Sequence, residues 1–260
     1  MKRVKIVKFD LSTGKVQRKF DYVAEEKPLH IHVNGKHYAT ITCSPSNLKE
    51  LAVGHLLSEG IIKALEEIAE INLKNDGTCQ IKLKPKINIK NRIALARPYS
   101  RIISSVCGGT WPHAFVGKMP KATSNLKVKA QLIKECVKNL NVMAETFRKT
   151  GGVHAAAIYK SDGTIVAFAE DIGRHNAVDK AIGTAALNKA DFSNCFLALS
   201  GRLTADIVLK AARTKIPIIA SIAAALDSGI EIAKQTNITL IGFVRGNRMN
   251  IYSFPKRILS

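Results

Sequence analysis

Paired cysteines are missing from this sequence. The five cysteines are an odd number, lie far apart and form no CxxC pair: Cys43, Cys79, Cys107, Cys136 and Cys195. This spacing excludes a disulfide framework and a structural zinc site as organising features. Four of them lie in apolar stretches typical of strands and helices, where we expect small buried hydrophobes. The exception is Cys107.

Long hydrophobic runs are also missing. No apolar stretch approaches the roughly 20 residues that a membrane-spanning helix requires. The first residues, MKRVKIVKFD, alternate charged with apolar side chains instead of forming the core of a signal peptide. We therefore expect a cytoplasmic protein without a membrane partner.

Acidic residues and aromatics are scarce. The chain has 20 Asp and Glu against 40 Lys and Arg, which gives a formal net charge of +20. Such a charge attracts anions, whether nucleic acid, a phosphorylated cofactor or an acidic protein, and part of it can be solvated surface. Aromatic residues make up only 6% of the chain and interleave with no basic tract, so nucleic acid is the least favoured partner.

The first hundred residues combine strand patterns with one helix. Strands are predicted at residues 4–9, 19–24, 29–33, 37–42, 70–74 and 79–84. A turn at Asn34-Gly35 joins two of them into a hairpin. A helix capped by Ser44 or Ser46 carries apolar residues at helical spacing and ends at Gly60. This pattern predicts a small α+β domain over residues 1–98.

Residues 99–124 have no clear periodicity and contain several glycines and prolines, which predicts a long loop that carries Cys107. Beyond it, helices and buried strands alternate. Helices are predicted at residues 126–148, 175–188, 203–213 and 226–235, with apolar strands between them. This order predicts a layered α/β domain over residues 125–260 with a largely parallel or mixed sheet.

Cys107 lies in the segment SSVCGG, between serines and glycines. Glycines let backbone N–H groups approach the sulfur and lower the pKa of the thiol, and a mobile thiol can visit two partners. The residues alone leave two interpretations open, a reactive nucleophile and an ordinary free thiol.

The segment TGGVHAAA places Gly152 and His154 at the start of a strand. Two adjacent glycines indicate a tight turn or a close backbone approach. The sequence leaves three roles open for His154: a general base, a donor that binds a ligand, or a core histidine whose hydrogen bonds are made within the protein.

Polar residues gather where two predicted strands end and helices begin. The segment EDIGRHNAVDK supplies one group, and SGR supplies a second at the end of a later strand. Open α/β sheets bind ligands at such junctions, where helix N-terminal amides favour anions. The alternative is an N-cap with salt bridges. The candidate binding residues are Asp171, Arg174, His175, Asn176, Ser200, Gly201 and Arg202.

A last candidate follows the strand at residues 238–244. Arg245 and Arg248 flank Gly246 and Asn247 in a turn after Phe243 and Val244. Two guanidinium groups beside exposed amides suit a phosphate or the edge of a guanine, although a plain basic turn has the same pattern.

Together these segments resemble the formate dehydrogenase accessory sulfurtransferase (FdhD) family over nearly the whole chain. The motifs are EKPLHIHVNG, LAVGHLLSEGII, TGGVHAAA, EDIGRHNAVDKAIG, SGR and TLIGFVRGNRMNIY. The resemblance implies a sulfurtransferase that receives sulfur from a cysteine desulfurase as a persulfide on Cys107. It passes the sulfur to the molybdenum or tungsten bis(guanine dinucleotide) cofactor of formate dehydrogenase.

The resemblance also implies that Phe243 to Arg248 bind the cofactor and that the residues around His175 line the same cavity. GDP then mimics part of this cofactor. It further implies a cytidine deaminase-like fold for the C-terminal domain and a homodimer. One feature departs from the family, whose loop usually carries two cysteines, because VCGG keeps only Cys107. A persulfide needs one sulfur, but a resolving cysteine in the same loop is missing.

Three other functions compete with this interpretation. A zinc deaminase needs His-x-Glu and a later Pro-Cys-x-x-Cys, whereas the chain has His154-Ala155-Ala156 and Ser200-Gly201-Arg202. A chaperone would hold the cofactor without moving sulfur. A nucleic-acid-binding protein would bind duplex DNA with a steep salt dependence.

Overall fold

The computed structural model describes residues 1–85, 87–96 and 119–260. The predicted loop over residues 99–124 therefore lies for the most part outside the described residues, and so does Cys107.

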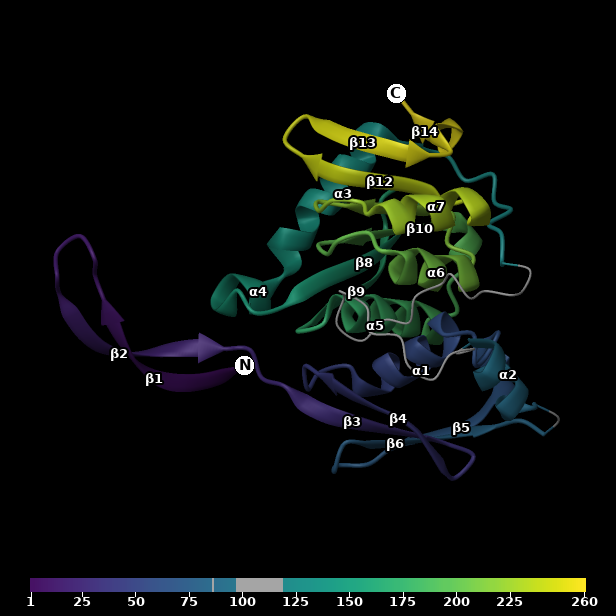
Figure 1. The fold of residues 1–260 in the computed structure, drawn as a ribbon, viewed down its shortest axis with the longest axis horizontal. Helices are drawn as coiled ribbons and strands as arrows, with labels where there is room; N and C mark the ends of the chain where they lie inside the picture. Colours follow the sequence, from purple (N-terminus) through teal and green to yellow (C-terminus); the bar gives the residue numbers. More distant parts are fainter. Residues whose placement is uncertain (86, 97–118) are drawn as a thin grey trace.

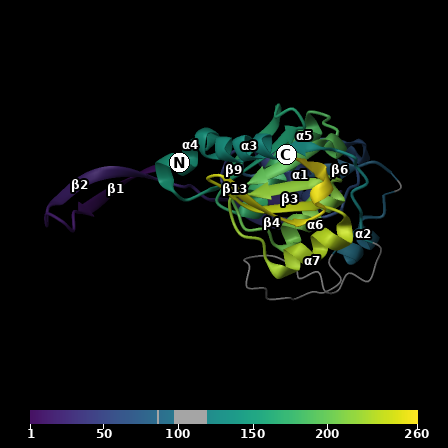
Figure 2. The same ribbon diagram turned by 90° about the horizontal axis from the view of Figure 1, so that it is seen from above.

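The chain begins with an antiparallel hairpin that projects from the body of the molecule, as both views show (Figures 1 and 2). Its strands are β1 (Lys2–Phe9) and β2 (Val16–Val23). Most of its apolar side chains are exposed, and Leu11 at its tip is 92% exposed. The hairpin therefore adds little to the hydrophobic core.

A four-stranded sheet follows, in the order β4-β3-β6-β5. Its strands are β3 (Lys27–Val33), β4 (Lys36–Cys43), β5 (Ile68–Leu73) and β6 (Thr78–Leu83). Helix α1 (Leu48–Ser58) and a 3₁₀ turn (Leu65–Glu67) connect β4 to β5, and α2 (Ile89–Ala96) follows β6. The predicted hairpin turn at Asn34-Gly35 is confirmed, since both residues have the positive φ that such turns require.

The C-terminal part forms a six-stranded mixed sheet in the order β13-β12-β11-β10-β8-β9. The strands are β8 (His154–Lys160), β9 (Ile165–Asp171), β10 (Cys195–Leu199), β11 (Ile218–Ser221), β12 (Thr239–Arg245) and β13 (Arg248–Ser253). Only the pairs β10 with β11 and β11 with β12 are parallel. The structure thus confirms a mixed α/β fold.

Helices cover both faces of this sheet because its central strands are apolar on both sides. On one face, Ala157 and Phe196 pack against α3 (Ala130–Met143). On the other, Ile158 and Leu197 belong to the core beneath α5 (Arg174–Leu187) and α6 (Ala205–Arg213), beside which lies α7 (Asp227–Thr236). A short parallel pair, β7 (Val128–Lys129) with β14 (Ile258–Leu259), and 3₁₀ turns at Phe192–Asn194 and Pro255–Arg257 complete the chain.

Helix α1 lies between α5 and the four-stranded sheet (Figure 1). Leu29 and Leu56 from the N-terminal part share one hydrophobic core with Ile182 and Leu197 from the C-terminal part. The two sheets are therefore joined through a layer of helices. The predicted domain boundaries at residues 98 and 124 stay a prediction.

Two local predictions are wrong. The helix expected over residues 126–148 is two helices, because Ala144 has a non-helical ψ of 76° and separates α3 from α4 (Glu145–Thr150). The expected serine cap of α1 is also absent, since the N-cap is Asn47 in the left-handed conformation. The Ser44 hydroxyl instead accepts a hydrogen bond from the Ile172 amide, which ties β4 to the end of β9.

Candidate functional site

The residues predicted to bind a ligand come together at one edge of the six-stranded sheet. Strands β10, β11 and β12 are parallel, so their carboxyl ends meet at this edge. Strand β8 runs antiparallel to β10, which brings its first residue, His154, beside Ser200. His154 also pairs with Asp171 at the end of β9. We refer to this region as the strand-end site.

Ser200 holds the centre of the strand-end site. Its hydroxyl accepts a hydrogen bond from the Ala155 amide at 3.0 Å and lies 3.3 Å from Nδ1 of His154. The backbone of Gly201 accepts a hydrogen bond from the buried Ser221 hydroxyl at 2.7 Å. Three consecutive strand ends are thereby joined through hydroxyl groups.

Gly201 has to be glycine because Arg174 packs against it. A Cβ on Gly201 would lie 2.9 Å from Cβ and 3.0 Å from Cδ of Arg174. The aliphatic part of Arg174 therefore crosses the backbone of the SGR segment. This contact fixes the start of α5 relative to the end of β10.

Asp171 supports the site from within the protein. Its carboxylate is fully buried and accepts hydrogen bonds from the Ser44 amide at 3.0 Å and the Gly173 amide at 2.9 Å. Nζ of buried Lys180 lies 2.6 Å from it, and the amide of Asn176 donates to it at 2.9 Å. These internal donors surround the carboxylate, so Asp171 orients the start of α5 rather than facing outward.

The turn between β12 and β13 lies at the same edge. Its backbone is unusual, because Phe243 has φ 53° although it is a bulky residue, and a β-bulge interrupts the pairing between Gly242 and Arg245. Such conformations cost about 1–3 kcal/mol and concentrate at functional sites. The Arg245 guanidinium lies 4.9 Å from the centre of the Phe243 ring.

The turn is exposed from Arg245 to Arg248, and Lys134 of α3 donates a hydrogen bond to the Asn247 side chain. Val244 is separated from the other candidates, since its side chain is buried in the apolar core beneath α3. Gly152 is exposed just before β8, and a Cβ there would lie 3.0 Å from Cβ of Ala24.

Sequence reasoning missed Asp206, in the first turn of α6. Its carboxylate lies 3.9 Å from Nε2 of His175. Burial, and then the charge of Glu59, raise the pKa of Asp206 to about 6. Burial, and then the charges of Lys210 and Arg174, lower the pKa of His175 to about 4. Like His175, Asp206 lies in the first turn of a helix that follows a strand, so the same pattern applies to it.

The strand-end site is electropositive at neutral pH. Burial, and then the charges of Arg174 and Arg202, lower the pKa of His154, so this histidine adds no charge of its own. The positive charge comes from guanidinium groups, among them those of Arg174 and Arg202 beside His154. An anionic ligand with hydrogen-bond acceptors therefore suits this edge better than a cation does.

The FdhD/NarQ family profile matches residues 24–259. The chain belongs to the FdhD/NarQ family. Relatives match it over nearly their full length. A protein from Sulfurisphaera tokodaii named "Sulfur carrier protein FdhD" is 36% identical over 263 residues, which cover 100% of this chain and 99% of the relative. A protein of the same name from Shouchella clausii is 36% identical and covers 94% of this chain and 92% of the relative.

A solved structure supports the fold of this FdhD/NarQ family member. The crystal structure of a protein from Desulfotalea psychrophila, described as a formate dehydrogenase accessory protein, superposes with a TM-score of 0.79. It is 28% identical and covers 99% of this chain and 98% of the other. None of the helices in residues 1–85, 87–96 and 119–260 is both long and apolar enough to cross a bilayer.

Proposed function

We propose that this chain is a sulfurtransferase for formate dehydrogenase. It takes sulfur from a cysteine desulfurase as a persulfide on Cys107. It then passes the sulfur to the molybdenum or tungsten bis(guanine dinucleotide) cofactor, which is its substrate. Family membership over residues 24–259 and the names of the relatives support the proposal.

The observation that carries the assignment to Cys107 is the state of the other four cysteines. Cys43, Cys79, Cys136 and Cys195 are all buried, and in each case burial raises the pKa of the thiol to about 11. At pH 7, roughly one part in ten thousand of such a thiol is thiolate, the form that attacks sulfur. Elimination therefore favours Cys107 as the carrier.

Loading is a thiol exchange that balances without an external oxidant. The Cys107 thiolate attacks the terminal sulfur of the persulfide on the desulfurase, and the S–S bond of that persulfide breaks. The desulfurase cysteine leaves as a thiolate, and Cys107 holds the sulfur as a new persulfide. The two-electron oxidation of the Cys107 sulfur is matched by the two-electron reduction of the desulfurase cysteine, so the two proteins together are unchanged in oxidation state.

Unloading needs two electrons when the sulfur leaves as sulfide. Two thiols of a small reductant supply them: one persulfide and two thiols give the Cys107 thiol, one disulfide and hydrogen sulfide. The loop has no second cysteine, and each of the four described cysteines is buried, so an external thiol fits this chain better than an internal one.

Mass spectrometry tests the loading step. After incubation with a cysteine desulfurase and cysteine, we expect the intact protein to gain the mass of one sulfur atom, located on the peptide that contains Cys107. The gain should disappear in Cys107→Ala and persist in the control Cys136→Ala. Sulfur found on any other cysteine, or none in the wild type, would contradict the proposal.

We propose the strand-end site as the place where the guanine dinucleotide cofactor binds. The support is the set of arginines at one edge, Arg174, Arg202, Arg245 and Arg248, beside the backbone of Gly201 and Gly246. Of the other candidates, His154, His175, Asn176, Ser200 and Asn247 offer hydrogen-bonding groups at this edge. Asp171 and Val244 support it from inside.

Calorimetry with GDP tests the cofactor proposal. We expect Arg248→Ala to weaken GDP binding about tenfold or more, because a charge-assisted hydrogen bond to phosphate contributes about 1.5–3 kcal/mol. The control is Lys138→Ala, which removes the same charge from the exposed face of α3 and should leave the affinity unchanged. No GDP binding by the wild type would count against this site.

The missing second loop cysteine favours one alternative, a chaperone that holds the cofactor without transferring sulfur. Cys107→Ala separates the two functions in a host whose own carrier has been deleted. Loss of formate dehydrogenase activity with GDP binding intact supports sulfur transfer. Unchanged activity supports the chaperone.

We also propose three properties that the family resemblance implies. The mixed six-stranded sheet, covered by helices on both faces, supports a cytidine deaminase-like fold for the C-terminal part. Free thiols at all four described cysteines fit the cytoplasm, where thiols stay reduced. A homodimer is testable by light scattering coupled to size-exclusion chromatography.

A further inference from the structure

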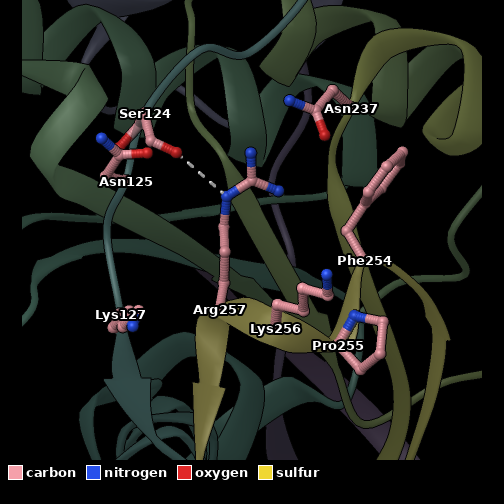
Figure 3. A pocket seen from close by; sticks show the side chains of 8 residues that line it. All are labelled: Ser124, Asn125, Lys127, Asn237, Phe254, Pro255, Lys256 and Arg257. Atoms are coloured by element: carbon pink, nitrogen blue, oxygen red, sulfur yellow. Dashed lines mark hydrogen bonds between the residues drawn. The ribbon is translucent and has the colours of Figure 1, made fainter.

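A cavity of about 680 Å³ lies beside the start of β12, at the opposite end of this strand from the turn that contains Arg245 and Arg248. Figure 3 shows the residues that line it. One wall is the segment before β7, with Ser124, Asn125 and Lys127. The facing wall is Asn237 after α7 and the segment Phe254 to Arg257. These walls come from three separate parts of the chain.

The lining of this cavity carries three cations and no carboxylate. Lys127, Lys256 and Arg257 line it, together with neutral residues only. Within the part of the chain that the structure describes, none of the three forms an ion pair. Burial lowers the pKa of Arg257, as expected for a cation that leaves water without gaining an acidic partner.

Arg257 is held in position by neutral groups. The residue is only 9% exposed, Nε donates to the Ser124 carbonyl at 3.2 Å, and Nη1 donates to the Thr239 hydroxyl at 3.3 Å. Figure 3 shows its guanidinium reaching between Ser124 and Asn237. Among the described residues, Nη2 has no acceptor. The guanidinium is therefore fixed and keeps donor capacity for a ligand.

The wall that contains Arg257 also offers a flat apolar surface. Phe254 is 36% exposed, and its ring lies 5.9 Å from the Arg257 guanidinium. The backbones of Phe254 and Asn237 both have positive φ, 42° and 58°. The Asn237 amide is fixed by donating to the Ala122 carbonyl at 2.6 Å. A ring stacked on Phe254 would lie next to three positive charges.

We propose that this cavity is a binding site for a small organic phosphate that carries a flat ring. The phosphate binds Nη2 of Arg257 and the ammonium groups of Lys127 and Lys256, and the ring packs against Phe254. A cavity of about 680 Å³ is within the range of small-molecule sites, roughly 300–1,000 Å³, and large enough for a ligand of nucleotide size.

This phosphate cavity is distinct from the strand-end site. Thr239, which contacts Arg257, is the first residue of β12, and Arg245 is the last. Six residue steps of roughly 3.3 Å separate them by about 20 Å. A single small ligand cannot reach both, so the inference does not depend on the proposed cofactor site.

Calorimetry with phenyl phosphate and with inorganic phosphate tests the inference on the full chain. We expect both to bind, with phenyl phosphate tighter because only its ring contacts Phe254. The double variant Lys127→Gln/Lys256→Gln should weaken both at least about tenfold. Both lysines are exposed. The hydrogen bonds that hold this wall in place come from Arg257, so the double variant should keep the fold.

The matched control is Lys138→Gln/Lys160→Gln, which lowers the net charge equally at exposed positions elsewhere. It should leave both affinities unchanged. The inference is overturned if neither probe binds at millimolar concentration. It is equally overturned if both double variants lose the same affinity, since that result identifies diffuse attraction to a basic surface.

Discussion

Asp206 and His175 face each other across the first turns of α6 and α5, and their pKa values shift in opposite directions. The pKa of Asp206 rises to about 6 through burial and Glu59, and the pKa of His175 falls to about 4 through burial, Lys210 and Arg174. Between about pH 4 and pH 6 both side chains are therefore neutral. Acidification removes a negative charge from the strand-end site without adding a positive one on His175.

Replacing Asp206 by Asn should change the pH dependence of stability. The folded pKa lies above the model value of 3.8, so the native state binds more protons than the unfolded state between about pH 4 and pH 6. Asp206 therefore adds stability as the pH falls through this window. When the pH falls from 7 to 4.5, the free energy of unfolding of Asp206→Asn should fall by about 1–2 kcal/mol relative to that of the wild type.

Urea unfolding at the two pH values measures this difference, and the variant should be the more stable protein at pH 7. His175→Asn gives the opposite test. Because the pKa of His175 is lowered, the wild type loses stability as the pH falls from 6.5 to about 4. His175→Asn lacks this loss, so its free energy of unfolding should rise relative to that of the wild type over the same pH range. Parallel curves for wild type and Asp206→Asn would show that the carboxyl is not desolvated.

At the scale of elements, the crossing of α1 over α5 joins the two sheets. The backbones touch at two glycines: a Cβ on Gly54 would lie 1.7 Å from the Asp179 carbonyl oxygen, and one on Gly183 would lie 1.9 Å from that of Glu50. Beside this contact, buried Lys210 of α6 bonds to Asp179 and Glu59 at 2.9 Å. Three helices are thereby locked by one close contact and one ion-pair network.

Gly54→Ala should destabilise the protein by at least about 2–3 kcal/mol, because the added methyl group forces the helices apart. The sign of the change is the test. Alanine is the better helix former by about 1 kcal/mol, so a helix with free space at this position would become more stable. Chemical denaturation measures the change, and a stabilised variant would contradict the close crossing.

At the scale of the whole molecule, the hydrophobic core continues from the four-stranded sheet through the helical layer to the six-stranded sheet. Such continuity predicts one cooperative unfolding unit. The buried cysteines report on it from different layers: Cys43 and Cys79 lie in the four-stranded sheet, Cys195 lies in the six-stranded sheet and Cys136 lies in α3.

Thiol labelling across a denaturant series should show one reactive thiol in the native protein and four that become reactive together. The fast thiol should disappear in Cys107→Ala. Peptide mapping by mass spectrometry gives the midpoint for each cysteine. If Cys43 and Cys79 become reactive at a lower denaturant concentration than Cys136 and Cys195, the two parts unfold as separate domains.

The sequence by itself determined the local elements and the family. Periodicity and turn residues located the Asn34-Gly35 hairpin, the alternation of strands and helices after residue 150, and the polar clusters at strand ends, because each depends on neighbours in the chain. The motifs around His175 and Arg245 indicated the family that the comparisons confirm.

Only the tertiary structure decided which of those residues meet. The inward position of Asp171, the Asp206 carboxylate beside His175 and the cavity at Arg257 all depend on elements far apart in sequence. The physical reason is that packing decides how deeply a side chain is buried and which charges lie next to it. Burial and neighbouring charges set the pKa values, and packing also decides whether a donor finds an acceptor. No periodicity along the chain records them.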